Sequence, residues 1–152
     1  MDIQALATGT AALITGYGIE NVYDYGPDNP NLPAVIVPAL AANITYDLAY
    51  QRGLDTVSFS LTVLVAKAFD RPAQTLLASY VASGAGKARS IKNAVEQWRQ
   101  PSFGWPDNPI IAAYPACTKL LVTQFRMLSH EEVASYQAVG GSFTIEANVE
   151  GP

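Results

Sequence analysis

Cysteine and histidine are almost absent from this chain of 152 residues, which contains one of each, Cys117 and His130. A single cysteine excludes an internal disulfide and any metal site built from several thiolates. With one histidine as well, the chain has few of the side chains that bind transition metals or form nucleophile and base pairs. The sequence therefore predicts no metal and no cofactor, and it favours a protein that is not an enzyme.

Charged residues are also scarce, at 14% of the chain, and basic residues are fewer than acidic ones. The formal net charge of −4 provides no basic field that would attract a nucleic acid. Lys87, Arg89, Lys92 and Arg99 do lie close together, and we interpret them as the solvated face of a helix. A surface with so few charges is often covered by other subunits, most commonly in a homo-oligomer.

Long apolar runs are missing too, since no segment reaches the roughly 20 apolar residues of a membrane-spanning helix. No basic flank precedes the first apolar segment, as it would in a secretory signal. We therefore expect a soluble protein that has no membrane partner and is not exported. Because 49% of the residues are apolar, the chain can bury one core, and we expect a single domain over residues 1–152.

The sequence does contain helical periodicity in three places. Residues 3–14, 73–81 and 91–98 carry apolar side chains at helical spacing, which predicts three helices. Asp70 and Ser90 are good N-caps for the second and third, and the glycines after residue 15 should end the first. The side chains expected to face the core from the second helix are Ala73, Leu76, Leu77, Tyr80 and Val81.

Alternation with a period of two predicts strands over residues 43–67, 119–128 and 135–149, with shorter ones near residues 19–25 and 34–37. The segment 43–67 should be a long hairpin that turns near Gly53. Its second half should bury Val57, Phe59, Leu61, Val63 and Val65, leaving Thr56, Ser58, Ser60, Thr62 and Leu64 on a wet or subunit-facing side. A bulge is expected at Gly140 and Gly141. Strands mixed with segregated helices predict an α+β fold with an antiparallel or mixed sheet.

The stretch "SGAGKARS" (residues 83–90) has the glycines, lysine and serine of a phosphate-binding loop. A true P-loop needs a preceding strand, an earlier glycine five residues before the second and a hydroxyl directly after the lysine. Here Val81 and Ala88 occupy those two positions, and a helix comes before the loop. We interpret the stretch as a glycine-rich helix end followed by a Ser90 cap, with a nucleotide-binding module that uses Lys87 and Ser90 as the alternative.

Other polar groups give no active site. The trio His130–Glu132 is typical of an exposed turn, and Cys117 of a buried structural thiol. Asp24, Asp28 and Asp47 lack the regular spacing of a calcium loop.

Two longer stretches resemble a known family. They are "ITYDLAYQRGLDTVSFSLTVLVAKAFDRPAQTLLASYVASGAGKARSIKNAVE" (Ile44–Glu96) and "YQAVGGSFTIEANVE" (Tyr136–Glu150). A Thr-Tyr-Asp strand, an Arg-Gly-x-Asp turn, an alternating strand, an Asp-Arg helix start and a Ser-Ile-Lys helix start follow one another in order. This order is similar to that of the tail terminator proteins of long-tailed bacteriophages, especially those of actinobacterial hosts. Residues 99–116 depart from the pattern.

The resemblance implies a small α+β subunit that forms a ring, commonly a hexamer, in the neck region of the virion after assembly in the host cytoplasm. Such a ring caps the tail tube, stops the polymerisation of tube protein and receives the head-side neck or connector proteins. DNA passes through it without specific binding. The alternative within the same class is another neck component, a head-closure or tail-completion protein.

Aromatic residues and arginine concentrate binding energy at interfaces. Our candidate interface residues are therefore Tyr46, Tyr50, Arg52 and Asp55 of the hairpin, together with Phe103 and Trp105 of the later loop. The alternative for Tyr46 and Tyr50 is packing on the subunit's own sheet, where cross-strand aromatic pairs are common.

Overall fold

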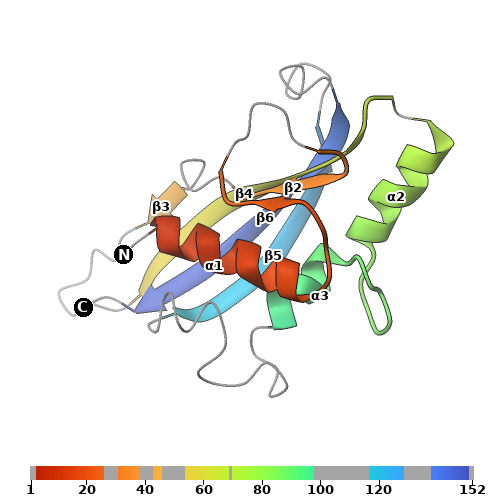
Figure 1. Cartoon of the computed structure of the whole chain (residues 1–152). Helices are drawn as coiled ribbons and strands as arrows, with labels where there is room; N and C mark the ends of the chain where they lie inside the picture. The colour runs from red at the N-terminus through yellow and green to blue at the C-terminus, as the bar shows by residue number, and fades with distance from the viewer. Residues whose placement is uncertain are drawn as a thin grey trace.

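Three helices pack on one mixed sheet of six strands in the computed structural model, which confirms the predicted α+β fold (Figure 1). The structure describes residues 3–25, 31–37, 43–45, 54–68, 70–97, 117–128 and 138–150. The helices in this part are α1 (Ile3–Gly16), α2 (Arg71–Val81) and α3 (Ile91–Glu96). The strands are β1 (Val22–Tyr23), β2 (Ala34–Ile36), β3 (Asn43–Thr45), β4 (Leu54–Ala66), β5 (Cys117–Met127) and β6 (Val139–Glu150).

Strand β4 is the centre of the sheet. It pairs with β6 along one edge and with both β2 and β3 along the other, in the order β1-β2-β4-β6-β5 with β3 beside β4. The pairing of β1 with β2 is parallel, and the other pairs are antiparallel. Residues 43–45 pair antiparallel with residues 56–58, which confirms the predicted pairing of the two halves of segment 43–67, and the turn predicted near Gly53 is outside the described residues.

The helix ends follow the capping residues that the sequence contains. Asp70 Oδ1 accepts a hydrogen bond of 3.0 Å from the amide of Ala73, and Ser90 Oγ accepts one of 3.1 Å from the amide of Asn93. Val81 was expected to face the core but is 38% exposed. It is the last residue of α2 and lies about 100° around the helix from the buried Tyr80, beyond the edge of the apolar stripe.

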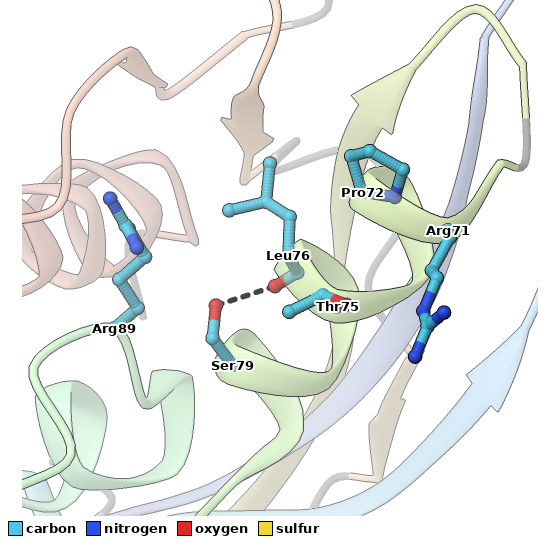
Figure 2. Close-up of a pocket in the computed structure, with 6 residues that line it drawn as sticks. All are labelled: Arg71, Pro72, Thr75, Leu76, Ser79 and Arg89. Atoms are coloured by element: carbon cyan, nitrogen blue, oxygen red, sulfur yellow. Dashed lines mark hydrogen bonds between the residues drawn. The ribbon is translucent and has the colours of Figure 1, made fainter.

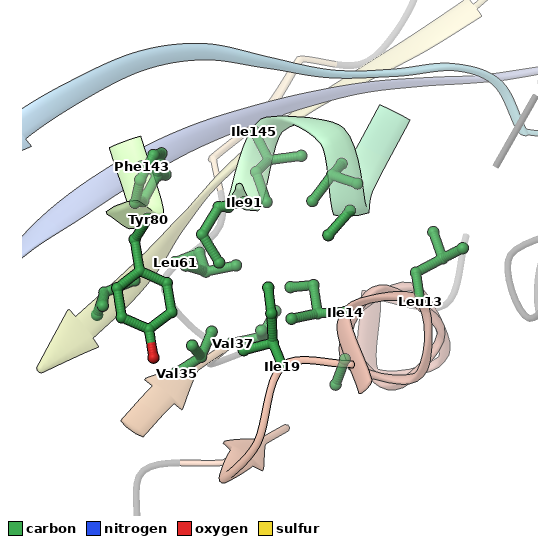
Figure 3. Close-up of a cluster of buried hydrophobic side chains, with 14 of the residues drawn as sticks. Leu13, Ile14, Ile19, Val35, Val37, Leu61, Tyr80, Ile91, Phe143 and Ile145 are labelled. Atoms are coloured by element: carbon green, nitrogen blue, oxygen red, sulfur yellow. The ribbon is translucent and has the colours of Figure 1, made fainter. Parts of the chain in front are cut away.

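One hydrophobic core lies between the helices and one face of the sheet (Figure 3). Leu13 and Ile14 of α1 and Ile91 of α3 meet the inward side chains of the strands, such as Leu61 and Ile145, and all five are fully buried. The buried residues of α2, Ala73, Leu77 and Tyr80, belong to the same cluster. All three helices therefore cover the same face of the sheet.

The bulge predicted at Gly140 and Gly141 is wrong, because the extra residues lie on the strands beside β6. The register between β4 and β6 shifts at Val65, and that between β5 and β6 shifts at Thr118 and Thr123. The two glycines are explained by close approach instead. A β-carbon at position 140 would lie 1.8 Å from the main-chain oxygen of the neighbouring β4, and one at position 141 would lie 2.3 Å from a ring atom of β5.

Candidate functional site

The residues predicted from the sequence to form an interface fall largely outside the described part of the chain. Those outside it are Tyr46, Tyr50, Arg52, Phe103 and Trp105. Asp55 lies in β4, opposite Val149 of β6, and its side chain is outside the described part as well. These six assignments stay predictions.

The loop between α2 and α3 has the structure of a helix connection. Gly84 and Gly86 have φ angles of 104° and 77°, which glycine adopts without strain. The hydroxyl of Ser90 is buried and already accepts the Asn93 amide, so it is not placed to hold a magnesium ion. The element before the loop is α2 and not a strand. This geometry favours the helix-connection interpretation over the nucleotide-binding one.

A hollow of about 440 Å³ lies between this loop, the end of α1 and α3. Its polar side chains are used within the subunit. Tyr17 donates its hydroxyl hydrogen to the Lys87 carbonyl at 2.8 Å, and Gln97 Nε2 donates to the Leu13 carbonyl at 2.9 Å. The carboxylate of Glu96 also lines the hollow and is paired with the ammonium group of Lys92 at 2.6 Å. We therefore assign a structural role to the residues around this hollow, because their hydrogen bonds connect the end of α1 to the loop and to the end of α3.

The remaining candidates for metal or catalytic chemistry are not brought together in the described residues. No group of three His, Cys, Asp or Glu side chains there is arranged to hold a metal ion. Asp24 accepts a hydrogen bond of 3.0 Å from the hydroxyl of Thr8. Residues 130–132, Asp28 and Asp47 are outside the described part, as is the side chain of Cys117 in β5.

The sheet face opposite the helices carries a row of hydroxyl side chains, which we call the hydroxyl face. Its members are Thr56, Ser58, Ser60 and Thr62 of β4 and Ser142 and Thr144 of β6. The pairs Ser60 with Thr144 and Thr62 with Ser142 are directly opposite in register, so the row continues across two strands. All of these side chains except Ser142 are partly exposed.

One expected member of this face is buried instead. Leu64 has no exposed surface, because it packs with Ile36 and Ala138 in a second, smaller apolar cluster on the same side of the sheet. The wet side predicted for β4 therefore extends from Thr56 to Thr62 and ends there.

A second hollow, of about 450 Å³, lies along α2 and is flanked by two arginines. Arg71 begins α2 and Arg89 lies in the loop before α3, while Pro72 and Leu76 provide apolar surface between them (Figure 2). The sequence predicted Arg89 and Lys87 on a helix face. That prediction is wrong for these two, because both residues lie in the loop. Lys92 lies on α3 as predicted, paired with Glu96 at 2.6 Å, and Arg99 is outside the described part. Arg71 was missed as a surface residue, because it stands between Asp70 and Pro72 with no run of basic residues to mark it.

The phenol of the buried Tyr80 in α2 has a shifted pKa. Burial raises the pKa of Tyr80 above its ordinary value of 10.0, the positive charge of Arg89 partly opposes the rise, and the negative charge of Glu20 adds to it. Below pH 10 the phenol is neutral in both the folded and the unfolded chain, and its stabilising contribution is complete.

Above pH 10 the unfolded chain loses the Tyr80 proton before the folded chain does. The free energy of unfolding is therefore expected to fall as the pH rises through the folded pKa of Tyr80. The Tyr80→Phe variant should show a shallower fall above about pH 10 in urea unfolding curves. Equal slopes for the two proteins would contradict the assignment.

Neither protein-family models nor curated proteins give a match to this sequence. Within the described part of the chain, every helix is too short or too polar to cross a membrane.

Proposed function

We propose that this chain is a structural virion protein, a tail terminator that acts by assembling with copies of itself into a ring. The ring caps the tail tube, stops its polymerisation and joins the tail to the head-side neck proteins. The resemblance of residues 44–96 and 136–150 to tail terminators supports this role. The observation on which the proposal rests most directly is the hydroxyl face, a broad polar surface on the side of the sheet away from all three described helices.

The chemistry of the hydroxyl face suits contact between proteins. Serine and threonine hydroxyls both donate and accept hydrogen bonds, so they can pair with many kinds of partner group or with ordered water. Their side chains are short, so ordering them at an interface costs less conformational entropy than ordering lysine or glutamate. A second protein surface can therefore approach the sheet closely over β4 and β6. A ring subunit needs such a surface in addition to the face that holds its own core.

Ring assembly tests the proposal directly. We expect light scattering and electron microscopy of the purified protein to show closed rings. The double variant Ser60→Arg/Thr144→Arg places two long cations at the centre of the hydroxyl face and should abolish the rings while circular dichroism stays unchanged. The matched control, Gln4→Arg/Ala12→Arg, adds the same charge to the exposed side of α1 and should keep them. A wild-type protein that stays monomeric at high concentration would overturn the proposal.

Polymerising tube protein separates a terminator from other neck components. Rings added during polymerisation should shorten the tubes and bind their ends, as seen by electron microscopy. Rings that bind head-side proteins and leave the tube length unchanged would favour a head-closure or tail-completion protein instead.

Calorimetric titration with nucleotide and magnesium tests the module that uses Lys87 and Ser90. The structural role predicts no heat of binding. Heat that disappears in the Lys87→Ala variant would favour the nucleotide-binding alternative.

A further inference from the structure

The charges of this acidic chain are unevenly distributed. Positions 67–92 carry five basic residues and one acidic residue, which is a net charge of +4. The other positions carry four basic and twelve acidic residues, which is a net charge of −8. The basic segment includes α2, the loop after it and the start of α3, and Figure 1 shows α2 at the end of the sheet away from β3. This segment is therefore cationic, whereas the chain as a whole is anionic.

The hollow flanked by Arg71 and Arg89, which we call the arginine groove, lies in this cationic segment. Both arginines are exposed. Within the described part of the chain neither groove arginine has an acidic partner, unlike Lys92, which pairs with Glu96. Each guanidinium therefore keeps donors that can bind a carboxylate in a bidentate manner.

The arrangement of the groove indicates the size of its ligand. In Figure 2 the two guanidinium groups lie on opposite sides of the hollow and do not point toward one another. They are not arranged to hold one small anion between them. Pro72 and Leu76 form an apolar surface between the arginines, and Ser79 uses its hydroxyl on the Leu76 carbonyl of its own helix. The groove thus fits an extended surface with apolar side chains between separated carboxylates.

We infer that the arginine groove binds an acidic surface of a second copy of this chain, in a head-to-tail contact. Charge complementarity favours a second copy as the partner of the groove, since the chain outside the basic segment carries a net charge of −8. Two different surfaces of the subunit meet in such a contact, and repetition of it closes a ring when the rotation is correct. The inference rests on the proposed ring and names one of the surfaces that would build it.

Charge reversal in the groove tests the inference. The variant Arg71→Glu/Arg89→Glu should need about tenfold or more protein than the wild type for half-assembly, as measured by sedimentation velocity in about 0.1 M NaCl. The wild type should also disassemble as NaCl is raised to about 1 M, because the Debye length falls from about 10 Å to about 3 Å. Unchanged circular dichroism would show that the variant is folded, as expected for two exposed residues.

The control is Lys67→Glu/Lys87→Glu, which makes the same change in net charge at exposed positions outside the groove. It should shift half-assembly by less than about threefold, since exposed charges contribute little when they make no direct contact. Equal shifts for the two variants would overturn the inference. Assembly of the groove variant at the wild-type concentration would overturn it too, and the proposed ring would stand. A wild type that is monomeric at low salt would overturn both.

Cross-linking identifies the occupant. The variant Arg71→Lys/Arg89→Lys keeps the charges and gives amines that a carbodiimide joins to touching carboxylates. In a mixture of isotope-labelled and unlabelled copies, mass spectrometry should find these lysines linked to acidic residues of another copy. Links within one copy alone would overturn the inference. Links to tube protein alone, in a mixture with it, would do the same and would assign the groove to that partner.

Discussion

Replacing Gly140 by alanine is expected to lower the free energy of unfolding by about 3 kcal/mol or more, measured in urea. The new β-carbon would lie 1.8 Å from the carbonyl oxygen of Val63 and 3.0 Å from the Cα of Leu64. Both are main-chain atoms of β4, the central strand of the sheet, so no side-chain rotation relieves the contact. The strands have to move apart, and the pairing around the register shift at Val65 is lost.

Gly141→Ala is the matched control. Its β-carbon would lie 2.3 Å and 2.4 Å from two ring atoms of Phe125, a partly buried side chain packed against the core, and 3.1 Å from the main-chain oxygen of Arg126. The ring can turn, although it packs on Phe143 with a centroid distance of 4.9 Å, so we expect a loss of about 1–2 kcal/mol. Equal losses for the two variants would contradict the pairing of β6 with β4 described above.

The Leu61→Ala variant is expected to lose about 2–5 kcal/mol of unfolding free energy. Leu61 is fully buried at the middle of β4, opposite Phe143, and it lies among side chains from the sheet and helices. Removing its branched end leaves a cavity that the close-packed core fills only in part. Urea unfolding with an unchanged m-value is the measurement.

Ser60, the residue before Leu61, provides the control, because successive side chains of a strand point to opposite faces. Ser60→Ala should change the free energy of unfolding by less than about 0.5 kcal/mol, since Ser60 is partly exposed on the hydroxyl face. A loss comparable to that of Leu61→Ala would mean that this face is packed within the subunit. It would then be unsuited to the intersubunit contact that we propose.

The elements that local pattern predicted well are those whose side-chain spacing repeats over many residues. The alternation from Val57 to Val65 predicted β4 and its buried face, and the helical spacing from residue 3 predicted α1. Asp70 and Ser90 marked the starts of α2 and α3 because a cap acts on amides within three residues. Each of these signals depends on neighbouring residues only, so the sequence alone is sufficient to predict the element.

The errors concern contacts between segments that are distant in the chain. The bulge was assigned to the glycines of β6, but the register shift lies at Val65, and the pairing of two strands decides this. Leu64 was expected on the wet side, and its burial depends on Ile36 and Ala138, which are far from it in the sequence. The arginine groove could not be predicted for the same reason, since the proximity of Arg71 and Arg89 follows from the packing of α2 beside the loop before α3.

By itself, the sequence determined the types of secondary structure, most of their bounds and the α+β class, because periodicity and capping act over a few neighbouring residues. It also determined the surplus of basic residues between positions 67 and 92. Only the tertiary structure decided that β4 and β6 align their hydroxyl side chains into one face, that Gly140 must lack a side chain and that two arginines flank one groove. These features depend on strand register and helix packing, which are set by contacts across the whole core.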